Sequence, residues 1–277
     1  MRTGRIARLL AAVLAVVLTG RLDGWAAPKD VILWVAGRLG VAGGTNAIVE
    51  YIGPGARTLS ATGKATITNM GAELGATTSV FPYDEHMAAY LKATGRAALV
   101  PIVEGAREHL QPDPEVEANP AAHYDQVLEL DLSTLEPHVV GPHTPDRARP
   151  LSALAAEVAD PANGFVDAIS SALIGSCTNS SYEDMSRAAD VAAQAAAQGL
   201  TAAAPFLVTP GSERVRATIA RDGQMDALAG IGGTVLANAC GPCIGQWRRS
   251  QNATEAPNTI VTSYNRNFPA RNDGQPA

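Results

Sequence analysis

Three cysteines constrain this chain of 277 residues more than any other feature. Cys177 closes one apolar run, while Cys240 closes a second run and opens a Gly-Pro turn that leads to Cys243. Two thiols in a CxxC pair, together with a third at the end of another expected strand, can converge on one metal centre. Spacing alone leaves the alternative equally open, namely a buried Cys177 beside a redox-active or zinc-binding CxxC pair.

The odd number of cysteines bears on the kind of centre. A closed structural zinc site needs four ligands, and none of the five histidines is near the cysteines in the sequence. A disulfide would leave one thiol over. A four-iron cluster held by three thiolates would leave one iron open to a substrate oxygen, where it could act as a Lewis acid.

Three segments around these residues carry a family resemblance. They are GSCTNS at residues 175–180, ACGPCIGQW at 239–247 and TSYNRNF at 262–268. They resemble the aconitase family, and most closely its mitochondrial-type branch, with the likeness running from about Leu18 to the last residue. The resemblance implies that Cys177, Cys240 and Cys243 hold a [4Fe-4S] cluster whose fourth iron binds citrate or isocitrate.

Two arginines follow the last of these segments. Arg266 and Arg271 lie five residues apart, and the planar guanidinium group binds a carboxylate through two parallel hydrogen bonds. Residue type alone favours two solvated surface arginines. The resemblance implies instead that both arginines bind substrate carboxylates and that Asn265 lies against the cluster.

A further chemical stretch covers residues 66–79. Asn69 and Glu73 are four residues apart, so they would share one face of a helix. A carboxylate near an open iron could accept a proton from a bound oxygen. Spacing alone favours a helix-capping Asn69 and a solvated Glu73, whereas the resemblance implies that both face the cluster and its bound oxygen.

The N-terminus resembles a secretory signal, with a basic start and a continuous apolar run from Leu9 to Leu18. The run is too short for a membrane-spanning helix. Because the family resemblance already begins at about Leu18, we expect residues 1–17 to be an atypical or mis-called start rather than a true signal. We therefore expect a bacterial cytoplasmic or mitochondrial matrix protein.

The expected fold is α/β. Strands and helices alternate in the second half of the chain, which predicts a parallel sheet with Cys177 and Cys240 at the carboxyl ends of strands. The resemblance implies three-layer α/β/α domains, with the family's second domain over 18–145 and much of its third domain over 165–277. A domain boundary or linker is expected over 146–164, because Pro137, Pro142, Pro145 and Pro150 follow one another in a short span. The expected helices cover 29–36, 69–76, 86–94, 181–199 and 210–221, the expected strands cover 47–52, 124–132, 165–175, 205–209, 234–237 and 258–263, and 111–122 is expected to be a loop.

The resemblance implies aconitate hydratase chemistry, a hydro-lyase reaction of the tricarboxylic acid cycle that interconverts citrate and isocitrate through cis-aconitate. The family's histidine–aspartate acid machinery precedes the region matched here, and its serine base follows it. We therefore expect this chain to turn over little or no citrate by itself, and the full-length enzyme to be a monomer with tricarboxylates as its small-molecule partners.

Three alternatives remain open. One is a homoaconitase or isopropylmalate isomerase, which would share the cluster but take a different substrate. Another is a non-catalytic iron-sensing or RNA-binding relative, although a net charge of −6 and the lack of a basic stripe argue against nucleic-acid binding. The last is a plain zinc-binding α/β module. We expect no membrane partner.

Overall fold

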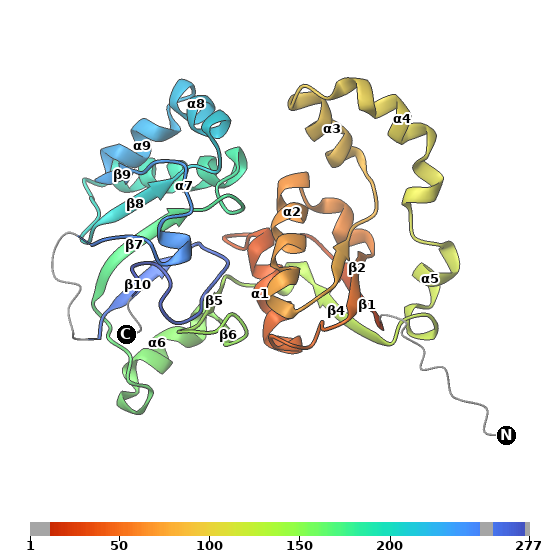
Figure 1. Ribbon diagram of the computed structural model, residues 1–277, viewed down its shortest axis with the longest axis horizontal. Helices are drawn as coiled ribbons and strands as arrows, with labels where there is room; N and C mark the ends of the chain where they lie inside the picture. The colour runs from red at the N-terminus through yellow and green to blue at the C-terminus, as the bar shows by residue number, and fades with distance from the viewer. Residues whose placement is uncertain (1–11, 250–256, 275–277) are drawn as a thin grey trace. The chain divides into compact units, whose positions relative to one another are not determined.

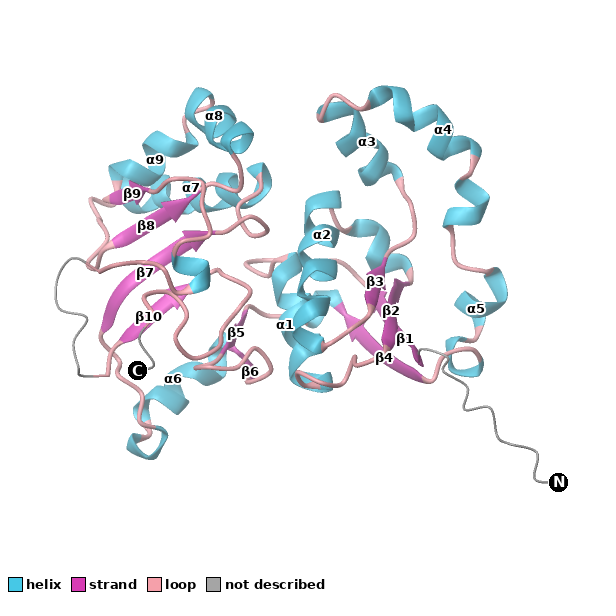
Figure 2. Ribbon diagram, viewed as in Figure 1, coloured by secondary structure: helices cyan, strands magenta, loops and turns pink. Residues whose placement is uncertain are grey.

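A computed structural model describes residues 12–249 and 257–274 of the chain (Figure 1). It divides into two compact units, Met1–Pro137 and His138–Ala277. Each unit contains a sheet of parallel strands with helices packed against it (Figure 2). The predicted α/β class with mostly parallel sheets is therefore confirmed.

The sheet of the first unit has the order β3-β2-β1-β4, and all of its strand pairs are parallel. Its strands are β1 (Ala12–Thr19), β2 (Ala47–Ile52), β3 (Thr78–Val80) and β4 (Gln126–Asp131). Strand β1 lies between β2 and β4, and its Leu14, Val16 and Leu18 are buried. The apolar run that resembles a signal therefore contains the central strand of a sheet.

This placement corrects the expected domain start at residue 18. Residues 12–17 belong to the folded unit, because β1 pairs with β2 from Ala12 to Val17. A strand covered on both faces in a parallel sheet is a short, continuously apolar run. The apolar part of a signal peptide has the same composition and a similar length, so the two cannot be separated by hydropathy.

The helices of the first unit agree only in part with expectation. They are α1 (Pro28–Leu39), α2 (Ala61–Asn69), α3 (Glu85–Ala93), α4 (Val100–Gly105) and α5 (Pro114–Ala118). The helix expected over 69–76 is wrong: α2 ends at Asn69, and residues 70–74 form the 3₁₀ helix η2 (Met70–Leu74). Ser60 begins α2 by accepting a hydrogen bond from the Gly63 amide at 3.0 Å. Glycine and threonine inside α2 are weak helix formers, which hid it from pattern analysis. The loop expected over 111–122 holds the short helix α5.

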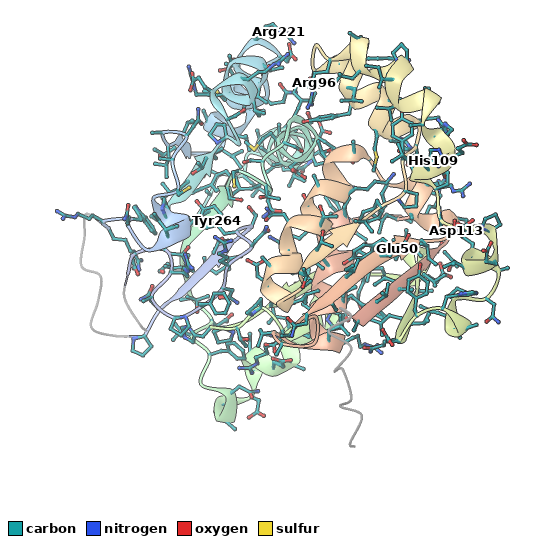
Figure 3. The ribbon with its side chains drawn as sticks, turned by 45° about the vertical axis from the view of Figure 1, so that its right-hand side comes forward. Glu50, Arg96, His109, Asp113, Arg221 and Tyr264 are labelled. Carbon is teal, nitrogen blue, oxygen red and sulfur yellow. The ribbon has the colours of Figure 1, made fainter. Side chains whose placement is uncertain are left out.

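The face of this sheet that carries Ala15 packs against α5 and the segment just before β4. Tyr124 and Ile52 form a small core with Ala15, and Val116 of α5 packs against it. The Tyr124 hydroxyl donates a 2.7 Å hydrogen bond to the carboxylate of Glu50, which projects from β2 (Figure 3). This bond joins β2 to the segment just before β4.

The second unit contains a four-stranded parallel sheet of order β10-β7-β8-β9 and a small antiparallel pair, β5 with β6. Its strands are β5 (His138–Val140), β6 (Ala148–Pro150), β7 (Ile169–Gly175), β8 (Phe206–Thr209), β9 (Gly233–Val235) and β10 (Thr259–Thr262). Its helices are α6 (Leu151–Ala159), α7 (Tyr182–Ala197), α8 (Glu213–Arg221) and α9 (Gln224–Gly230).

The expected linker over 146–164 is also corrected. Strand β6 and helix α6 occupy most of it, and both belong to the second unit, which begins at His138. The prolines that suggested a linker bound short elements instead, since Pro150 ends β6 and directly precedes α6. A cluster of prolines marks breaks in regular structure but not a domain boundary.

The main core of the second unit lies between the sheet and three helices. Met185 and Ala189 of α7, Ile219 of α8 and Leu228 of α9 pack around Val208 of β8. Helix α7 begins as expected, with a capping box between Ser181 and Asp184. Among the described residues, no helix is both long and apolar enough to cross a membrane.

The position of β1 predicts the effect of trimming its side chains. Leu18→Ala removes a side chain that is 0% exposed, and should lower the free energy of unfolding by about 2–5 kcal/mol. The matched control is Leu99→Ala, because Leu99 is 45% exposed in the same unit and should change stability by less than about 1 kcal/mol. Urea denaturation followed by circular dichroism measures both. Equal effects of the two variants would contradict the central position of β1.

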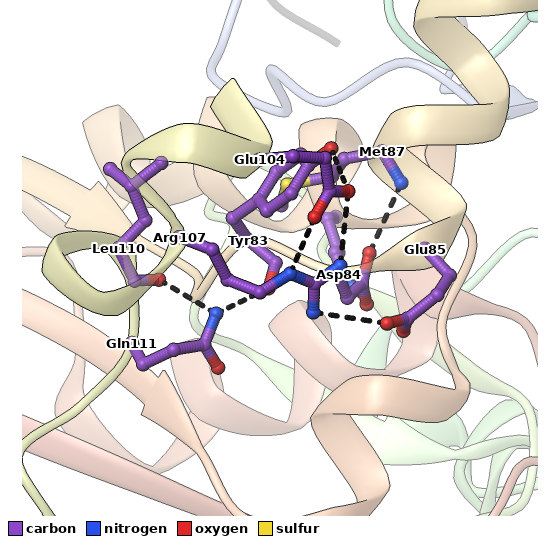
Figure 4. Close-up of polar contacts among 9 residues, drawn as sticks. Tyr83, Asp84, Glu85, Met87, Glu104, Arg107, Leu110 and Gln111 are labelled. Carbon is purple, nitrogen blue, oxygen red and sulfur yellow. Dashed lines mark hydrogen bonds and ion pairs between the residues drawn. The ribbon is translucent and has the colours of Figure 1, made fainter. Parts of the chain in front are cut away.

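A polar cluster joins the segment after β3 to the helices α3 and α4 (Figure 4). Asp84 caps α3, since its carboxylate accepts from the Met87 amide at 3.1 Å. Arg107 contacts Glu104 at 2.8 Å and Glu85 at 3.0 Å, but these pairs are partly exposed and contribute little. The buried member of the cluster is the ion pair between Asp84 and Lys64 of α2, whose side chains are 6% and 4% exposed.

Breaking this buried pair from one side should be costly. Lys64→Met leaves the Asp84 carboxylate buried without its cation, so we expect a loss of about 3–5 kcal/mol in the free energy of unfolding. Adding Asp84→Asn should recover much of that loss, because asparagine still caps α3 and carries no charge. Lys92→Met, at an exposed position of α3, is the control. Denaturation curves that place the double variant below Lys64→Met would argue against this account.

Candidate metal centre

The strand order of the second sheet reverses at β7, because later strands were added on both of its sides. Strand β7 has β8 on one side and β10 on the other, and all three run parallel. Ligands of open α/β sheets bind outside the carboxyl ends of the strands at such a switch point. Cys177 follows the end of β7, Asn265 and Arg266 follow the end of β10, and Cys240 follows the end of β9. The topology therefore brings all three predicted segments to one edge.

The end of β7 requires an unusual backbone. Gly175 has φ +138°, and a Cβ atom there would lie 2.2 Å from the Thr209 carbonyl oxygen. Ser176 follows with φ +86°, a backbone conformation that residues other than glycine rarely adopt. Its hydroxyl oxygen accepts from the Thr178 and Asn179 amides, both at 3.4 Å. This tight turn leaves Cys177 exposed between two buried residues of the loop, Ser176 and Asn179.

The loop after β10 is fastened to the loop after β7. The Ser263 hydroxyl accepts from the Gly175 amide at 2.9 Å, and the Ser263 amide donates to Leu173 at 3.1 Å. The Asn179 side chain donates to the Ser263 carbonyl at 2.6 Å and also to the side-chain oxygen of Asn265. Asn265 is therefore held beside the Cys177 turn.

The CxxC segment packs on the residues that follow Arg266. Its centre is the 3₁₀ helix η8 (Pro242–Ile244), with Cys240 exposed and Cys243 half-buried. The Arg271 guanidinium donates to the Cys243 carbonyl at 3.0 Å. The Trp247 amide donates to the Asn272 carbonyl at 3.1 Å. These bonds join the cysteine pair to the arginine segment.

Two charged residues that were not predicted from the sequence, Arg249 and Asp273, also connect the CxxC segment to the arginine segment. Arg249 is largely buried and lies 3.3 Å from the Asp273 carboxylate. It also donates to the side chains of Asn258 at 2.8 Å and Ser170 at 3.2 Å. Neither residue belongs to a recognisable metal or carboxylate motif, so the only signal in the sequence was their closeness to Cys243 and Arg271.

The Cys243 thiol is influenced by the charges of the other two cysteines and of the two arginines. Burial raises the pKa of the Cys243 thiol, and the neighbouring thiols of Cys177 and Cys240 raise that pKa further. The guanidinium groups of Arg266 and Arg271 act in the opposite direction and lower it. Burial also raises the pKa of Tyr264, labelled in Figure 3, and Cys243 contributes to that rise.

The thiols are compatible with an iron–sulfur cluster. None of the three forms a disulfide, and they project from loops rather than from a closed core. In the parts of the chain that the structure describes, no three Cys, His, Asp or Glu side chains are close enough to share one metal ion. An iron–sulfur cluster does not need three side chains around one metal ion, because each of its cysteine ligands binds a different iron atom.

Asn69 and Glu73 belong to the first unit and are described there alone. Asn69 is the exposed last residue of α2, and Glu73 is buried in η2 at 5% exposure. A solvated Glu73, which spacing alone favoured, is therefore wrong. The change from α-helix to 3₁₀ helix at residue 70 also means that the two side chains do not follow the four-residue spacing of one α-helix.

Comparison with known proteins bears on what this centre is. A sequence model described as "Aconitase family (aconitate hydratase)" matches residues 1–277, the whole chain. The chain belongs to the aconitase family. The predicted family membership is thereby confirmed, and the match begins earlier in the chain than Leu18, where the resemblance was expected to start.

Curated relatives of this aconitase-family chain are similar in sequence over nearly its full length. Aconitate hydratase, mitochondrial, of Schizosaccharomyces pombe is 56% identical over 265 residues, which is 96% of this chain and 33% of the relative. The enzyme of the same name from Gracilaria gracilis is 56% identical over 95% of this chain and 33% of the relative. The probable mitochondrial aconitate hydratase of Dictyostelium discoideum is 56% identical over 94% and 33%. The chain thus spans about a third of the length of these relatives.

One solved structure with a distant likeness is the holo-form crystal structure of aconitase X from Thermococcus kodakaraensis. It is 14% identical, with a TM-score of 0.41, and the match covers 83% of this chain and 44% of that chain. A likeness at this level carries no argument about the site.

The close backbone approach at Gly175 predicts a substitution effect. Gly175→Ala should lower the free energy of unfolding by more than the roughly 1–2 kcal/mol that a left-handed conformation alone costs, because its Cβ atom would collide with the Thr209 carbonyl. Gly199→Ala is the control, since Gly199 has φ +71° but no atom within 4 Å of its added Cβ. Denaturation of both variants measures the difference. A Gly175→Ala effect no larger than that of Gly199→Ala would show that the collision relaxes easily.

Proposed function

We propose that this chain carries the cluster-binding part, and part of the substrate-binding part, of an aconitate hydratase. The observation that supports the proposal best is the convergence of three unpaired thiols and two guanidinium groups on the loops after β7, β9 and β10. Cys177, Cys240 and Cys243 would hold a [4Fe-4S] cluster, each through its thiolate. When bound, the cluster supplies a Lewis acid through the iron that lacks a cysteine ligand.

The arginines would bind and orient a tricarboxylate. Arg266 is exposed, so its guanidinium group is accessible to a carboxylate from solvent. Arg271 is half-buried and already donates to the Cys243 carbonyl, which leaves further donors of its guanidinium fork for a ligand. A bidentate pair between arginine and carboxylate fixes direction as well as affinity. The two arginines thus supply positive charge that acts on the Cys243 thiol and would suit a ligand with several carboxylates, such as citrate or isocitrate.

The resemblance to the aconitase family also assigns roles to two residues of the first unit. Glu73 is a buried carboxylate in η2, and Asn69 directly precedes that helix. Glu73 would exchange a proton with the substrate hydroxyl, while Asn69 would donate a hydrogen bond. The reaction is the interconversion of citrate and isocitrate through cis-aconitate. The relatives are mitochondrial aconitate hydratases by name, which favours the mitochondrial matrix as the location of this protein.

Reconstitution of the purified chain under anaerobic conditions tests the cluster. Iron and sulfide should assemble a [4Fe-4S] cluster, and mild oxidation should give a three-iron EPR signal that ferrous iron reverses. Cys177→Ser, Cys240→Ser and Cys243→Ser should each reduce bound iron and sulfide severely, because the chain has no other cysteine to substitute.

Two further measurements sharpen this test. Ser186→Ala, on helix α7 away from the cysteines, should bind iron like the parent chain. Citrate added to the reconstituted chain should change its EPR spectrum, and Arg266→Ala should weaken that response at least tenfold, as expected when a charged hydrogen-bond partner is removed. A folded, soluble chain that binds only zinc, or binds no metal, would refute the proposal. A stronger response to isopropylmalate than to citrate would redirect it to another substrate of the superfamily.

A further inference from the structure

The Asn179 side chain is a buried polar group that connects two loops of the second unit. The residue is 6% exposed, and it lies two positions after Cys177. Its Nδ2 atom donates to the Ser263 carbonyl at 2.6 Å and to the Oδ1 atom of Asn265. Its own Oδ1 atom is buried and has no hydrogen-bond partner among the described residues.

This pattern leaves only one possible orientation for the Asn179 amide. A backbone carbonyl can only accept, so the group that faces Ser263 must be the NH₂ of Asn179. The orientation of an asparagine amide is otherwise a matter of assignment from its hydrogen bonds. Asn179 adopts this amide orientation although its own side-chain oxygen is then buried without a hydrogen-bond partner. A buried polar atom without a partner ordinarily costs free energy.

The orientation of Asn179 in turn determines that of Asn265. The second hydrogen of the Asn179 NH₂ group points at Asn265, which must present its oxygen to receive it. The NH₂ group of Asn265 is therefore directed away from Asn179. Asn265 is itself buried, at 6% exposure, so a reversed amide would set two NH₂ groups against each other in a dry environment.

We propose that Asn179 is a positioning residue that locks the amide of Asn265, so that Asn265 presents its N–H donors, rather than its oxygen, to the cluster. The proposal rests on the proposed function for the identity of the acceptor. The sulfides and thiolates of a cluster are electron-rich acceptors, and hydrogen bonds to them tune the reduction potential and stability of the cluster. A reversed Asn265 would direct a carbonyl oxygen at them instead.

The lock itself can be tested without a cluster. In the metal-free chain labelled with ¹⁵N on asparagine, Asn179→Ala should shift the side-chain NH₂ resonances of Asn265, and Asn265→Ala should shift those of Asn179. The matched control is Asn238→Ala, because Asn238 lies two positions before Cys240 and donates to Glu213 at 2.6 Å. That variant should leave both pairs of resonances unchanged. Unchanged Asn265 resonances in Asn179→Ala would overturn the lock.

The consequence for the cluster is tested by a double-mutant cycle on the reconstituted chain. Asn179→Ala and Asn265→Ala should each accelerate the loss of cluster absorbance in air by about fivefold, the effect of one lost hydrogen bond. The double variant should be no faster than Asn265→Ala, because Asn179 acts only through Asn265. Multiplied effects in the double variant would overturn the proposal, as would an Asn179→Ala cluster as durable as the parent.

Isosteric variants control for misfolding, and they distinguish a failure of this proposal from a failure of the proposed cluster-binding function. Asn265→Asp can still accept from Asn179 but has no N–H donor, so it should destabilise the cluster while the Asn179 resonances keep a hydrogen-bonded position. Asn179→Asp has no donor and should behave like Asn179→Ala in both measurements. A parent chain that assembles no cluster would refute the proposed function alone, because the resonances of the metal-free chain still decide whether Asn179 locks Asn265.

Discussion

The parallel pairing of β7 with β10 is the constraint on which the candidate centre depends. These strands are far apart in the chain, and between them the polypeptide forms β8, β9 and their helices on the other side of β7. The pairing therefore creates the point where the strand order reverses. The loops that leave this point carry Cys177 on one side and Asn265 and Arg266 on the other. Residues almost 90 positions apart in the chain thus become neighbours through the pairing of the strands, and side-chain hydrogen bonds of Ser263 and Asn179 then fasten the two loops.

Buried amides and ion pairs give the two units their specific local geometry. Around the cysteines, Asn179 and Ser263 connect the loops, and Arg249 with Asp273 connects the CxxC segment to the arginine segment. In the first unit, Lys64 and Asp84 connect α2 to the start of α3. Buried polar groups of this kind contribute less to net stability than apolar packing does, but they permit few alternative arrangements. A cluster held by three thiols needs that restriction, since its ligands lie on separate loops.

Predictions from the sequence were accurate where one local pattern had one structural meaning. The capping box at Ser181 and Asp184 gave helix α7, and the alternation of strands and helices gave a parallel sheet. The predictions were wrong where two different structures have the same amino-acid composition. The apolar run that ends at Leu18 suits a signal peptide and a central strand equally, and only its partners β2 and β4 distinguish them. The prolines between Pro137 and Pro150 were interpreted as a linker because composition does not show that β5 pairs with β6.

The sequence by itself determined the chemistry available to this protein. It holds three thiols, two arginines five residues apart and the segments that place the chain in the aconitase family, because residue identity and short-range spacing are properties of the chain alone. The tertiary structure decided which of these groups act together. It joined the turn that carries Cys177 to Asn265 through the bonds of Asn179, directed the Asn265 amide and buried Glu73. Each of those outcomes depends on contacts between distant segments, and such contacts form only when the strands pair and exclude water.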